Sequence, residues 1–275
     1  MKAASISALC RRAGMSRQNY YAQRRTRQRR TVDADLVIRL VQQERQLQPR
    51  LGTRKLLHLV RRELRENGVA IGRDRFFGIL REGGLLLEPK PARPRTTRSR
   101  HSLPVFRNVV AAMEVNAPNQ AWASDITYIR TDEGFLYAAL ITDMFSRRIV
   151  GHAIGDSLEA EGCLQALNVA LATLPPGALP VHHSDRGCQY CCHLYVERLQ
   201  GAGLGISMTE QMHCYENALA ERVNGIVKQE YGLESTFRTK EQARKAFAEA
   251  VWLYNHKRPH MSLKYRTPEE VHQAA

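Results

Sequence analysis

The second half of the chain alternates between strand-like and helix-like patterns of hydrophobic residues. Three apolar runs, Ala123–Arg130, Phe135–Thr142 and Arg148–Ile154, are separated by short polar segments. Short connections of this kind predict an antiparallel meander of three strands. The next stretch, Glu159–Leu174, carries apolar residues at helical spacing and is followed by two prolines and a glycine, so it predicts a helix.

The same alternation continues towards the C-terminus. The pattern predicts a fourth strand at Leu179–His183, a helix from about Tyr190, a short extended piece near Gly205–Met208, and helices at Ala218–Glu230 and Thr239–His256. Three antiparallel strands, a helix, a further strand and trailing helices are the element order of a ribonuclease-H-like domain. We therefore predict an α/β domain of this class with a mixed five-stranded sheet.

The first third of the chain contains helical patterns. A helix over Ser7–Arg12, a turn and a second start at Ser16 resemble a small helix-turn-helix. The run Arg24–Arg30 is interpreted as a polybasic extension, and apolar positions from Asp33 onwards indicate another helix. Two further helices are predicted, one capped by Thr53 and ended by Asn67 and Gly68, and one from about Arg73 to Glu82.

A proline-rich polar segment separates these two parts. Residues 88–104 contain four prolines and lack apolar periodicity, which predicts a linker. The predicted organisation is a basic, helix-turn-helix-like all-α region at residues 1–87, the linker at 88–104, and the α/β domain with C-terminal helices at 105–275.

The positive charge of the chain is concentrated in its first part. The net charge is +14, and residues 1–100 contain 25 lysines and arginines against 8 aspartates and glutamates, whereas residues 101–275 contain 16 against 19. This asymmetry predicts a DNA-binding module. The candidate phosphate contacts are Arg54, Lys55, Arg73 and Arg75. The apolar stretches are too short for a membrane helix, so we expect a cytoplasmic protein without a membrane partner.

Three acidic residues occur where the predicted elements can bring them together. Asp125 lies inside the first strand, Asp185 follows the fourth strand, and Glu221 lies in a later helix with 35 residues between it and Asp185. Carboxylates from separate elements can hold a pair of divalent ions, which activate a nucleophile and stabilise charge in phosphodiester chemistry. We expect two Mg²⁺ ions, because Mg²⁺ takes oxygen ligands, with Mn²⁺ as a substitute.

Four sequence blocks carry a family resemblance. They are Trp122–Ile129, His183–Tyr190, Cys214–Glu221 with Lys228, and Tyr254–His260 with Thr267 and Pro268. In this order they resemble the DDE transposases of bacterial insertion sequences, in the retroviral-integrase-like group whose catalytic half is a second reading frame. The segments Ala8–Tyr21 and Arg50–Leu85 are similar to the leading helical region of that group. Glu216 departs from the family pattern, which usually has aspartate there.

The resemblance implies both a reaction and the residues that serve it. The reaction is strand cleavage followed by strand transfer, acting on terminal inverted repeats and target DNA. The implied partners also include further copies of the chain on DNA and an upstream-frame protein, or a fusion with it, and the implied place is the bacterial nucleoid. The implied catalytic metal ligands are Asp125, Asp185 and Glu221; Lys228 and Arg258 would lie near DNA phosphates, and Asn217 and His260 near the active centre.

Competing interpretations stay open. Asp143 is expected to make a turn contact or an ion pair through Ser146 and Arg147 rather than bind metal. The chain could also be a catalytically idle DNA-binding regulator, although three converging carboxylates favour an enzyme, or a ribonuclease-H-like nuclease that only hydrolyses DNA. A zinc site is a further alternative, but half of its ligand pattern is missing, so free thiols are expected; its candidate ligands are His182, His183, Cys188, Cys191, Cys192, His193 and Cys214.

Overall fold

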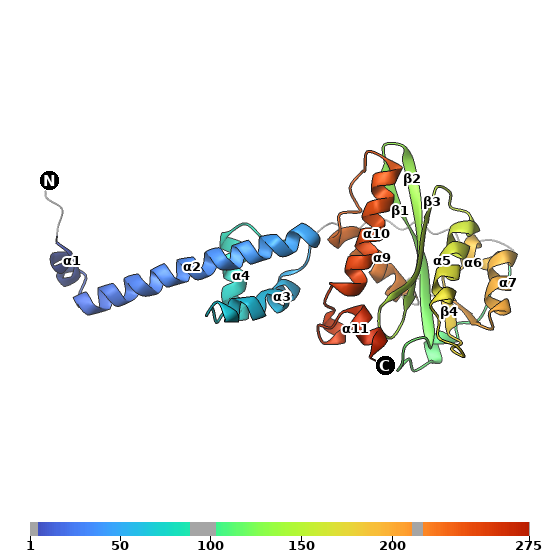
Figure 1. The fold of residues 1–275 in the computed structure, drawn as a ribbon, viewed down its shortest axis with the longest axis horizontal. Helices are drawn as coiled ribbons and strands as arrows, with labels where there is room; N and C mark the ends of the chain where they lie inside the picture. Colours follow the sequence, from blue (N-terminus) through green and yellow to red (C-terminus); the bar gives the residue numbers. More distant parts are fainter. Residues whose placement is uncertain (1–4, 89–102, 211–216, 275) are drawn as a thin grey trace. The chain divides into compact units, whose positions relative to one another are not determined.

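The computed structural model describes residues 5–88, 103–210 and 217–274 (Figure 1). The chain divides into two compact units, one of Met1–Gln46 with Leu51–Glu88, and the other of Leu47–Arg50 with Pro89–Ala275. The predicted linker, residues 88–104, lies almost wholly outside the described residues, as do Cys214 and Glu216. Within the described part, none of the helices combines the length and the apolar composition that a membrane crossing requires.

The N-terminal unit is entirely helical in its described part. Its helices are α1 (Ile6–Arg12), α2 (Arg17–Leu47), α3 (Thr53–Glu66) and α4 (Arg73–Glu82). A single core joins the last three of them. The buried side chains of this core include Val37, Leu40 and Val41 from α2, Leu57, Val60 and Leu64 from α3, and Phe76, Ile79 and Leu80 from α4.

Two local predictions for this unit are wrong. The segment Arg24–Arg30 is not a separate extension, because α2 runs unbroken through it to Leu47 (Figure 1, blue). The α2 sequence contains neither glycine nor proline, so no residue in it breaks the helix. Thr53 does not cap α3 either, since the extended residue before it, Gly52, occupies the N-cap position and Thr53 is the first helical residue.

The second unit is built on a five-stranded mixed sheet. Its strands are β1 (Ala121–Thr131), β2 (Gly134–Asp143), β3 (Ile149–Gly155), β4 (Val181–Ser184) and β5 (Gly205–Met208). The strand order is β3-β2-β1-β4-β5. The first three strands pair antiparallel, whereas β4 lies parallel to β1 and β5 parallel to β4. The predicted fold class, an α/β domain of the ribonuclease-H-like kind, is confirmed by this topology.

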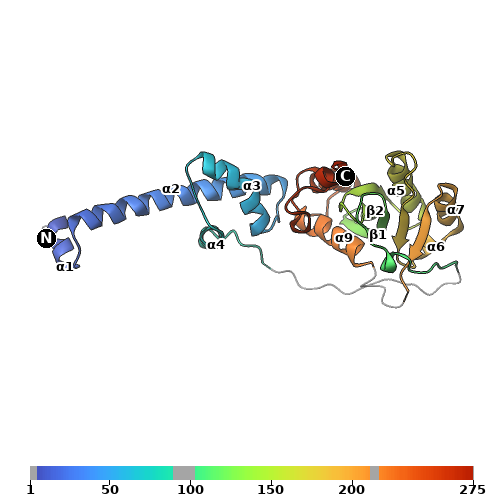
Figure 2. The ribbon, with the colours of Figure 1, turned by 90° about the horizontal axis from the view of Figure 1, so that it is seen from below.

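Helices cover both faces of the sheet (Figures 1 and 2). One face carries α5 (Ala160–Ala172), α6 (Cys188–Cys191) and α7 (His193–Gly201), which pack with Trp122 of β1. The other carries α9 (Ala218–Glu230) and α10 (Lys240–His256), which pack with Ile129 of β1. Even and odd positions of β1 therefore enter different cores. The remaining short helices are η1 (Val110–Ala112), η2 (Met261–Leu263) and α11 (Pro268–Gln273).

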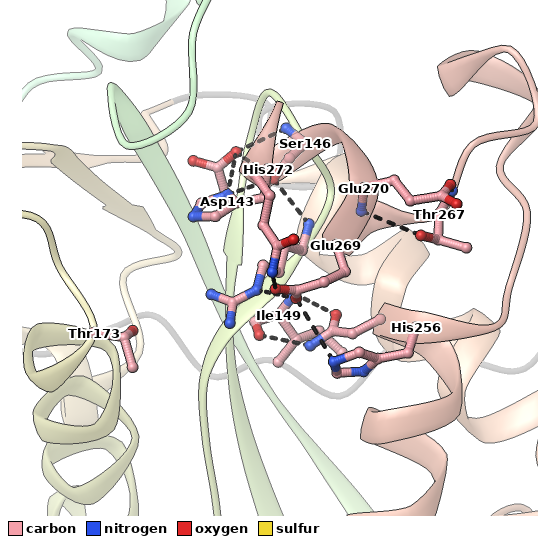
Figure 3. A network of polar contacts seen from close by, with 12 residues as sticks. Asp143, Ser146, Ile149, Thr173, His256, Thr267, Glu269, Glu270 and His272 are labelled. Carbon is pink, nitrogen blue, oxygen red and sulfur yellow. Dashed lines mark hydrogen bonds and ion pairs between the residues drawn. The ribbon is translucent and has the colours of Figure 1, made fainter. Parts of the chain in front are cut away.

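A polar network attaches the C-terminal helix to the end of β2 (Figure 3). The Oδ1 atom of Asp143 accepts hydrogen bonds from the backbone N–H and the hydroxyl of Ser146, both at 2.7 Å, and the Ser146 Oγ lies 2.9 Å from Nδ1 of His272. Burial raises the pKa of Asp143, but bonds from His272, Ser146 and Asn119 outweigh it and hold that pKa below its usual value. Asp143 thus makes the predicted turn contact.

The packing of β3 on α5 allows no side chain at Gly151. A Cβ atom there would overlap the carbonyl oxygen of Ala166 and lie 2.8 Å from the Cβ of Ala170. We predict that Gly151→Ala lowers the unfolding free energy by about 1–3 kcal/mol through overpacking. Denaturant unfolding followed by tryptophan fluorescence measures this, because both tryptophans, Trp122 and Trp252, lie in this unit.

Gly162→Ala, on helix α5, is the matched control. A Cβ atom at Gly162 meets nothing within 4 Å. Alanine is the better helix former by up to about 1 kcal/mol, so this variant is expected to be as stable as the natural chain or more so. Equal effects of the two substitutions would contradict the tight packing of β3 on α5.

Candidate active site

The three predicted acids converge where β4 ends beside β1. In the parallel register Ser124 of β1 lies opposite Ser184 of β4, so the next residues along the two strands are Asp125 and Asp185. Helix α9 runs along the same part of β1. It carries Glu221 in its first turn, and Asn224, one turn further on, donates a hydrogen bond of 2.8 Å from its Nδ2 to the Oδ2 of Asp125.

The start of α9 is held against β1 by Asn217. Its buried side-chain amide donates a 3.0 Å hydrogen bond to the carbonyl oxygen of Ser124, the residue before Asp125. Asn217, Glu221 and Asn224 are three or four residues apart, so they lie along one side of the helix. Glu221 therefore lies on the same side of α9 as Asn224, which contacts Asp125. Asn217 lies next to the acids, through its contact with Ser124.

The electrostatics of Asp125 show the same convergence. Burial raises the pKa of Asp125 to about 7, and the negative charges of Asp185 and Glu221 add to the increase. Hydrogen bonds from the backbone N–H of Ile126, at 2.8 Å, and from Asn224 act in the opposite direction but do not cancel it. A carboxylate whose pKa is raised by two other carboxylates marks a site that a cation would stabilise.

Asp185 is held by the tight turn that follows β4. Its Oδ1 accepts a 3.0 Å hydrogen bond from the backbone N–H of Gly187. A Cβ atom at Gly187 would lie only 3.0 Å from that same oxygen, so glycine suits this close approach. The turn leads directly into α6, and it fixes the carboxylate of Asp185 at the end of the strand.

Buried polar side chains join β1 to β4 beneath the acids. The hydroxyl of Ser124 lies 2.6 Å from Nε2 of His182, and the hydroxyl of Tyr195 lies 2.9 Å from the same nitrogen. Burial lowers the pKa of His182 to about 3, with a smaller effect of His183 in the same direction, so its imidazole is neutral. These contacts support the pairing of β1 with β4, since Ser124 lies on β1 and His182 lies on β4.

The donor set of the three acids suits a hard divalent ion. All of its atoms are carboxylate oxygens, which is the chemistry that Mg²⁺ takes. Among the described residues, no three or more histidine, cysteine, aspartate or glutamate side chains form a ready-made metal cage. Mg²⁺ commonly needs only one or two protein carboxylates and fills its other positions with water and substrate phosphate, so Asp125, Asp185 and Glu221 fit this ion without such a cage.

Three other predicted site residues lie in different surroundings. Lys228 of α9 places its Nζ 4.2 Å from the centroid of the Tyr128 ring on β1. Arg258 is 3% exposed, and its guanidinium donates to both carboxylate oxygens of Glu230 at 2.7 and 2.8 Å, so it forms an internal ion pair instead of facing a DNA phosphate. His260 is buried and packs edge-to-face on Tyr254, with ring centroids 5.1 Å apart.

The four N-terminal candidates lie in the helical unit. Arg54 is exposed and Lys55 half-buried on α3, while Arg73 and Arg75 are exposed on α4. Arg73 pairs with the adjacent Asp74 at 2.9 Å, and Arg75 pairs with Glu82 at 3.7 Å. Both are surface ion pairs of the kind that water screens, so they leave these arginines accessible to a polyanion.

Two features add to the sequence interpretation of the site. The sequence interpretation missed Asn224, although its position three residues after Glu221 in a predicted helix places it on the same side of that helix.

The cysteines of the zinc alternative that can be described are free thiols, with Cys188 exposed, Cys191 buried and Cys192 half-buried. Cys191 lies against Met208, at 3.6 Å between the sulfur atoms.

Comparisons with known proteins identify relatives along nearly the whole chain. Two profiles described as "Integrase core domain" match residues 115–214 and 202–268. A 31 kDa protein of insertion element IS600 from Shigella sonnei, named as uncharacterized, is 35% identical over 97% of this chain and 100% of its own length.

Two named transposases are also similar to the chain. The transposase for insertion sequence element IS629 of Shigella sonnei is 33% identical over 78% of this chain and 72% of its own length. Transposase InsF for insertion sequence IS3A of Escherichia coli strain K12 is 33% identical over 79% of this chain and 76% of its own length. A solved HTLV-2 integrase catalytic core domain in complex with magnesium is similar with a TM-score of 0.46 and 18% identity, covering 57% of this chain and 97% of that one.

The raised pKa of Asp125 makes a prediction about pH and stability. Well below pH 4 the carboxyl group is neutral in both folded and unfolded chains, whereas near pH 7 and above folding must place its charge beside two others. This carboxyl therefore costs stability as pH rises from about 4 to about 8. In metal-free protein, we expect Asp125→Asn to be more stable than the natural chain by roughly 4 kcal/mol at pH 8, with the difference closing below pH 4.

Denaturant unfolding at several pH values checks this, with Asp156→Asn as the control of opposite sign. Asp156 is an exposed acid whose pKa is lowered by Lys240 and Arg244, so its ionisation favours folding. Removing it is expected to destabilise the protein slightly at pH 8 and to have no effect at low pH. An Asp125→Asn difference that does not change with pH would contradict the convergence of the acids.

Proposed function

The chain belongs to the integrase-core transposases of bacterial insertion sequences, and on that premise we propose that it catalyses metal-dependent DNA strand cleavage and strand transfer at the ends of such an element. The observation that carries the proposal is the convergence of Asp125, Asp185 and Glu221 where β4 ends beside the middle of β1. A DNA-binding protein without catalysis has no use for three carboxylates whose mutual repulsion opposes folding.

The same three carboxylates are the residues that would hold the metal. Bound in pairs, divalent ions such as Mg²⁺ or Mn²⁺ lower the pKa of an attacking water or hydroxyl and neutralise charge on the reacting phosphate. Asn224 and the Ile126 N–H orient the Asp125 carboxylate, and the Gly187 N–H orients that of Asp185.

In the proposed reaction, a water molecule attacks the phosphodiester at the element end and frees a 3′ hydroxyl. That hydroxyl then attacks a phosphodiester of the target DNA, so one bond forms as another breaks and no covalent link to the protein is required. The rigid elements that carry the acids keep the reacting phosphates in place for both steps. The two steps can therefore share one site.

DNA capture is assigned in this proposal to the basic helical unit. The exposed arginines Arg54, Arg73 and Arg75 on α3 and α4 would contact phosphates of the terminal inverted repeats. Further copies of the chain would hold the two ends together, with target DNA as the second substrate. The upstream-frame protein implied by the sequence resemblance is a separate proposal, and adding it to the chain is expected to raise affinity for the element ends.

Substitution of single acids tests the catalytic assignment. We predict that Asp185→Asn and Glu221→Gln each lower strand cleavage and joining by on the order of 10³-fold or more, because each removes a charge on which transition-state stabilisation depends. Labelled element ends incubated with target DNA and Mg²⁺ or Mn²⁺ give both rates on a gel. Glu161→Gln, an exposed acid at the start of α5, is the matched control and is expected to retain full activity.

The same assay separates the alternative functions. Full activity in both acid variants would remove the catalytic assignment. A natural chain that binds the ends but neither cuts nor joins them is the outcome expected of an idle regulator. Cleavage without any joined product is the outcome expected of a nuclease that only hydrolyses.

Salt dependence tests the assignment of DNA capture. Each phosphate contact contributes about 0.9 to the slope of log affinity against log salt concentration. We predict that replacing Arg54, Arg73 and Arg75 together by glutamine lowers this slope by about 2 to 3. Fluorescence anisotropy with a labelled end duplex at several salt concentrations gives the slope.

The matched control removes the same kind of charge from the other unit. Arg244 of α10 donates to the carbonyl oxygen of Ile154 and to Asp156, both at 2.5 Å, so Arg244→Gln is expected to leave the slope unchanged. A slope that falls by the same amount per charge removed in both variants would show that net charge alone governs binding.

A further inference from the structure

The hairpin of β1 and β2 presents aromatic side chains to solvent beyond the acids. The pairing of β1 with β4 ends at Ser124, whereas its pairing with β2 continues to Thr131. In this extension Tyr128 is 37% exposed and Phe135 of β2 is 46% exposed. Because Phe135 pairs with Arg130, and Arg130 lies two positions after Tyr128 on one strand, all three share one face of the hairpin.

The two rings form a compact surface with a cation beside it. The ring centroids of Tyr128 and Phe135 are 5.7 Å apart, and the rings meet edge-to-face at 88°. The Nζ of Lys228 lies 4.2 Å from the Tyr128 centroid, and the Arg130 side chain is exposed on the same face. We call Tyr128, Phe135 and Lys228 the aromatic platform. Exposed aromatic rings next to positive charge are what single-stranded nucleic-acid sites use.

The platform lies a short, definable distance from the acids. Tyr128 is three residues beyond Asp125 on β1, which is about 10 Å along the strand, and this odd spacing directs the two side chains to opposite faces. Beyond Ser124 this edge of β1 is not paired with β4, and Lys228 of α9, the helix on the Asp125 face, reaches the Tyr128 ring, so the two faces meet at this edge. Lys228 is seven residues beyond Glu221 on α9, which is also about 10 Å along the helix. Strand and helix run in the same direction here, because Asn224 contacts Asp125 and Lys228 contacts Tyr128.

We propose that the aromatic platform binds an unpaired base of the DNA strand whose phosphate lies at the acids. This proposal rests on the proposed function of the site. A separation of about 10 Å corresponds to about three nucleotides at the 3.4 Å step of duplex DNA, and to fewer in a more extended unpaired strand. The base stacks on one of the two exposed rings, because rings at 88° cannot both lie parallel to it, and Lys228 and Arg130 neutralise the neighbouring phosphates. Stacking of this kind accepts any base, so the platform recognises the unpaired state of the DNA rather than its sequence.

A role confined to the hairpin makes a different prediction. Aromatic pairs across two strands contribute to sheet stability. If Tyr128 and Phe135 served only this purpose, their replacement would lower the thermal midpoint of unfolding and leave DNA affinity unchanged. If the platform instead docked another protein, DNA with and without unpaired bases would bind with equal affinity.

The test compares two labelled DNA probes with the full-length chain. One is a blunt duplex, and the other is the same duplex carrying a single-stranded arm of five thymidines. Affinities are measured by fluorescence anisotropy with Mg²⁺, and with EDTA in a parallel series so that cleavage does not alter the probe. We expect the natural chain to bind the armed probe more tightly, and Tyr128→Leu and Phe135→Leu each to lose about tenfold of that preference.

Three further variants make the result specific. Tyr128→Phe keeps the ring and is expected to keep the preference. Lys228→Gln is expected to weaken binding of the armed probe. Trp252→Leu is the matched control, because Trp252 is also 50% exposed and lies near a cation, Lys257, but on α10, and it is expected to bind as the natural chain does.

Photocrosslinking locates the contact independently of affinity. With 5-iododeoxyuridine placed in turn at each arm position, crosslinks to Tyr128 or Phe135 are expected at one or two adjacent positions. Unchanged probe preference in both leucine variants, or crosslinks that never reach β1 and β2, would overturn the platform. If only the platform proposal fails, the natural chain still cuts DNA. If the proposed function fails, the natural chain binds DNA but does not cut it.

Discussion

The parallel pairing of β1 with β4 is the constraint on which the site depends. Its register sets Ser124 opposite Ser184, so the strands continue into two carboxylates at neighbouring positions. A shift by one residue would turn the Asp125 side chain to the other face of the sheet. The buried contact between Ser124 of β1 and His182 of β4 also holds this register. Asn217 fixes the start of α9 to β1.

The acids are brought together at a cost that the surrounding structure offsets. Burial and two neighbouring negative charges raise the pKa of Asp125 to about 7, so its ionised form opposes folding near neutral pH. Hydrogen bonds from Ile126 and Asn224 partly compensate, and they also fix the direction of the carboxylate. The carboxylates of such a site are in position before a cation binds, and the cation then neutralises their charge.

The placement of α9 connects this chemistry to the rest of the molecule. One side of the helix packs into the core with Val223 and Val227, while a neighbouring stripe carries Glu221 and Lys228 along β1. Helix α9 therefore both stabilises the sheet and sets the distance between the acids and the aromatic platform. Function at this site follows from the way the helix is packed.

Several elements could be predicted from the sequence because their signals are local. Helices α4 and α9 and strand β5 have the predicted bounds, since apolar spacing and bounding glycines or polar residues lie within each segment. The predicted break before Asp33 was wrong because polar arginines carry no signal against helix, and α2 continues through them. The ion pair of Arg258 could not be predicted from local signals, because its partner Glu230 lies 28 residues away and only the fold brings them together.

The sequence by itself determined the family and the class of fold, and it predicts the three acids, because strand and helix periodicity, charge asymmetry and the order of short blocks are all present along the chain. The tertiary structure alone decided which polar residues meet those acids. The contact of Asn224 with Asp125, 99 residues earlier in the chain, depends on helix packing between distant segments, and a contact of that kind has no local signature.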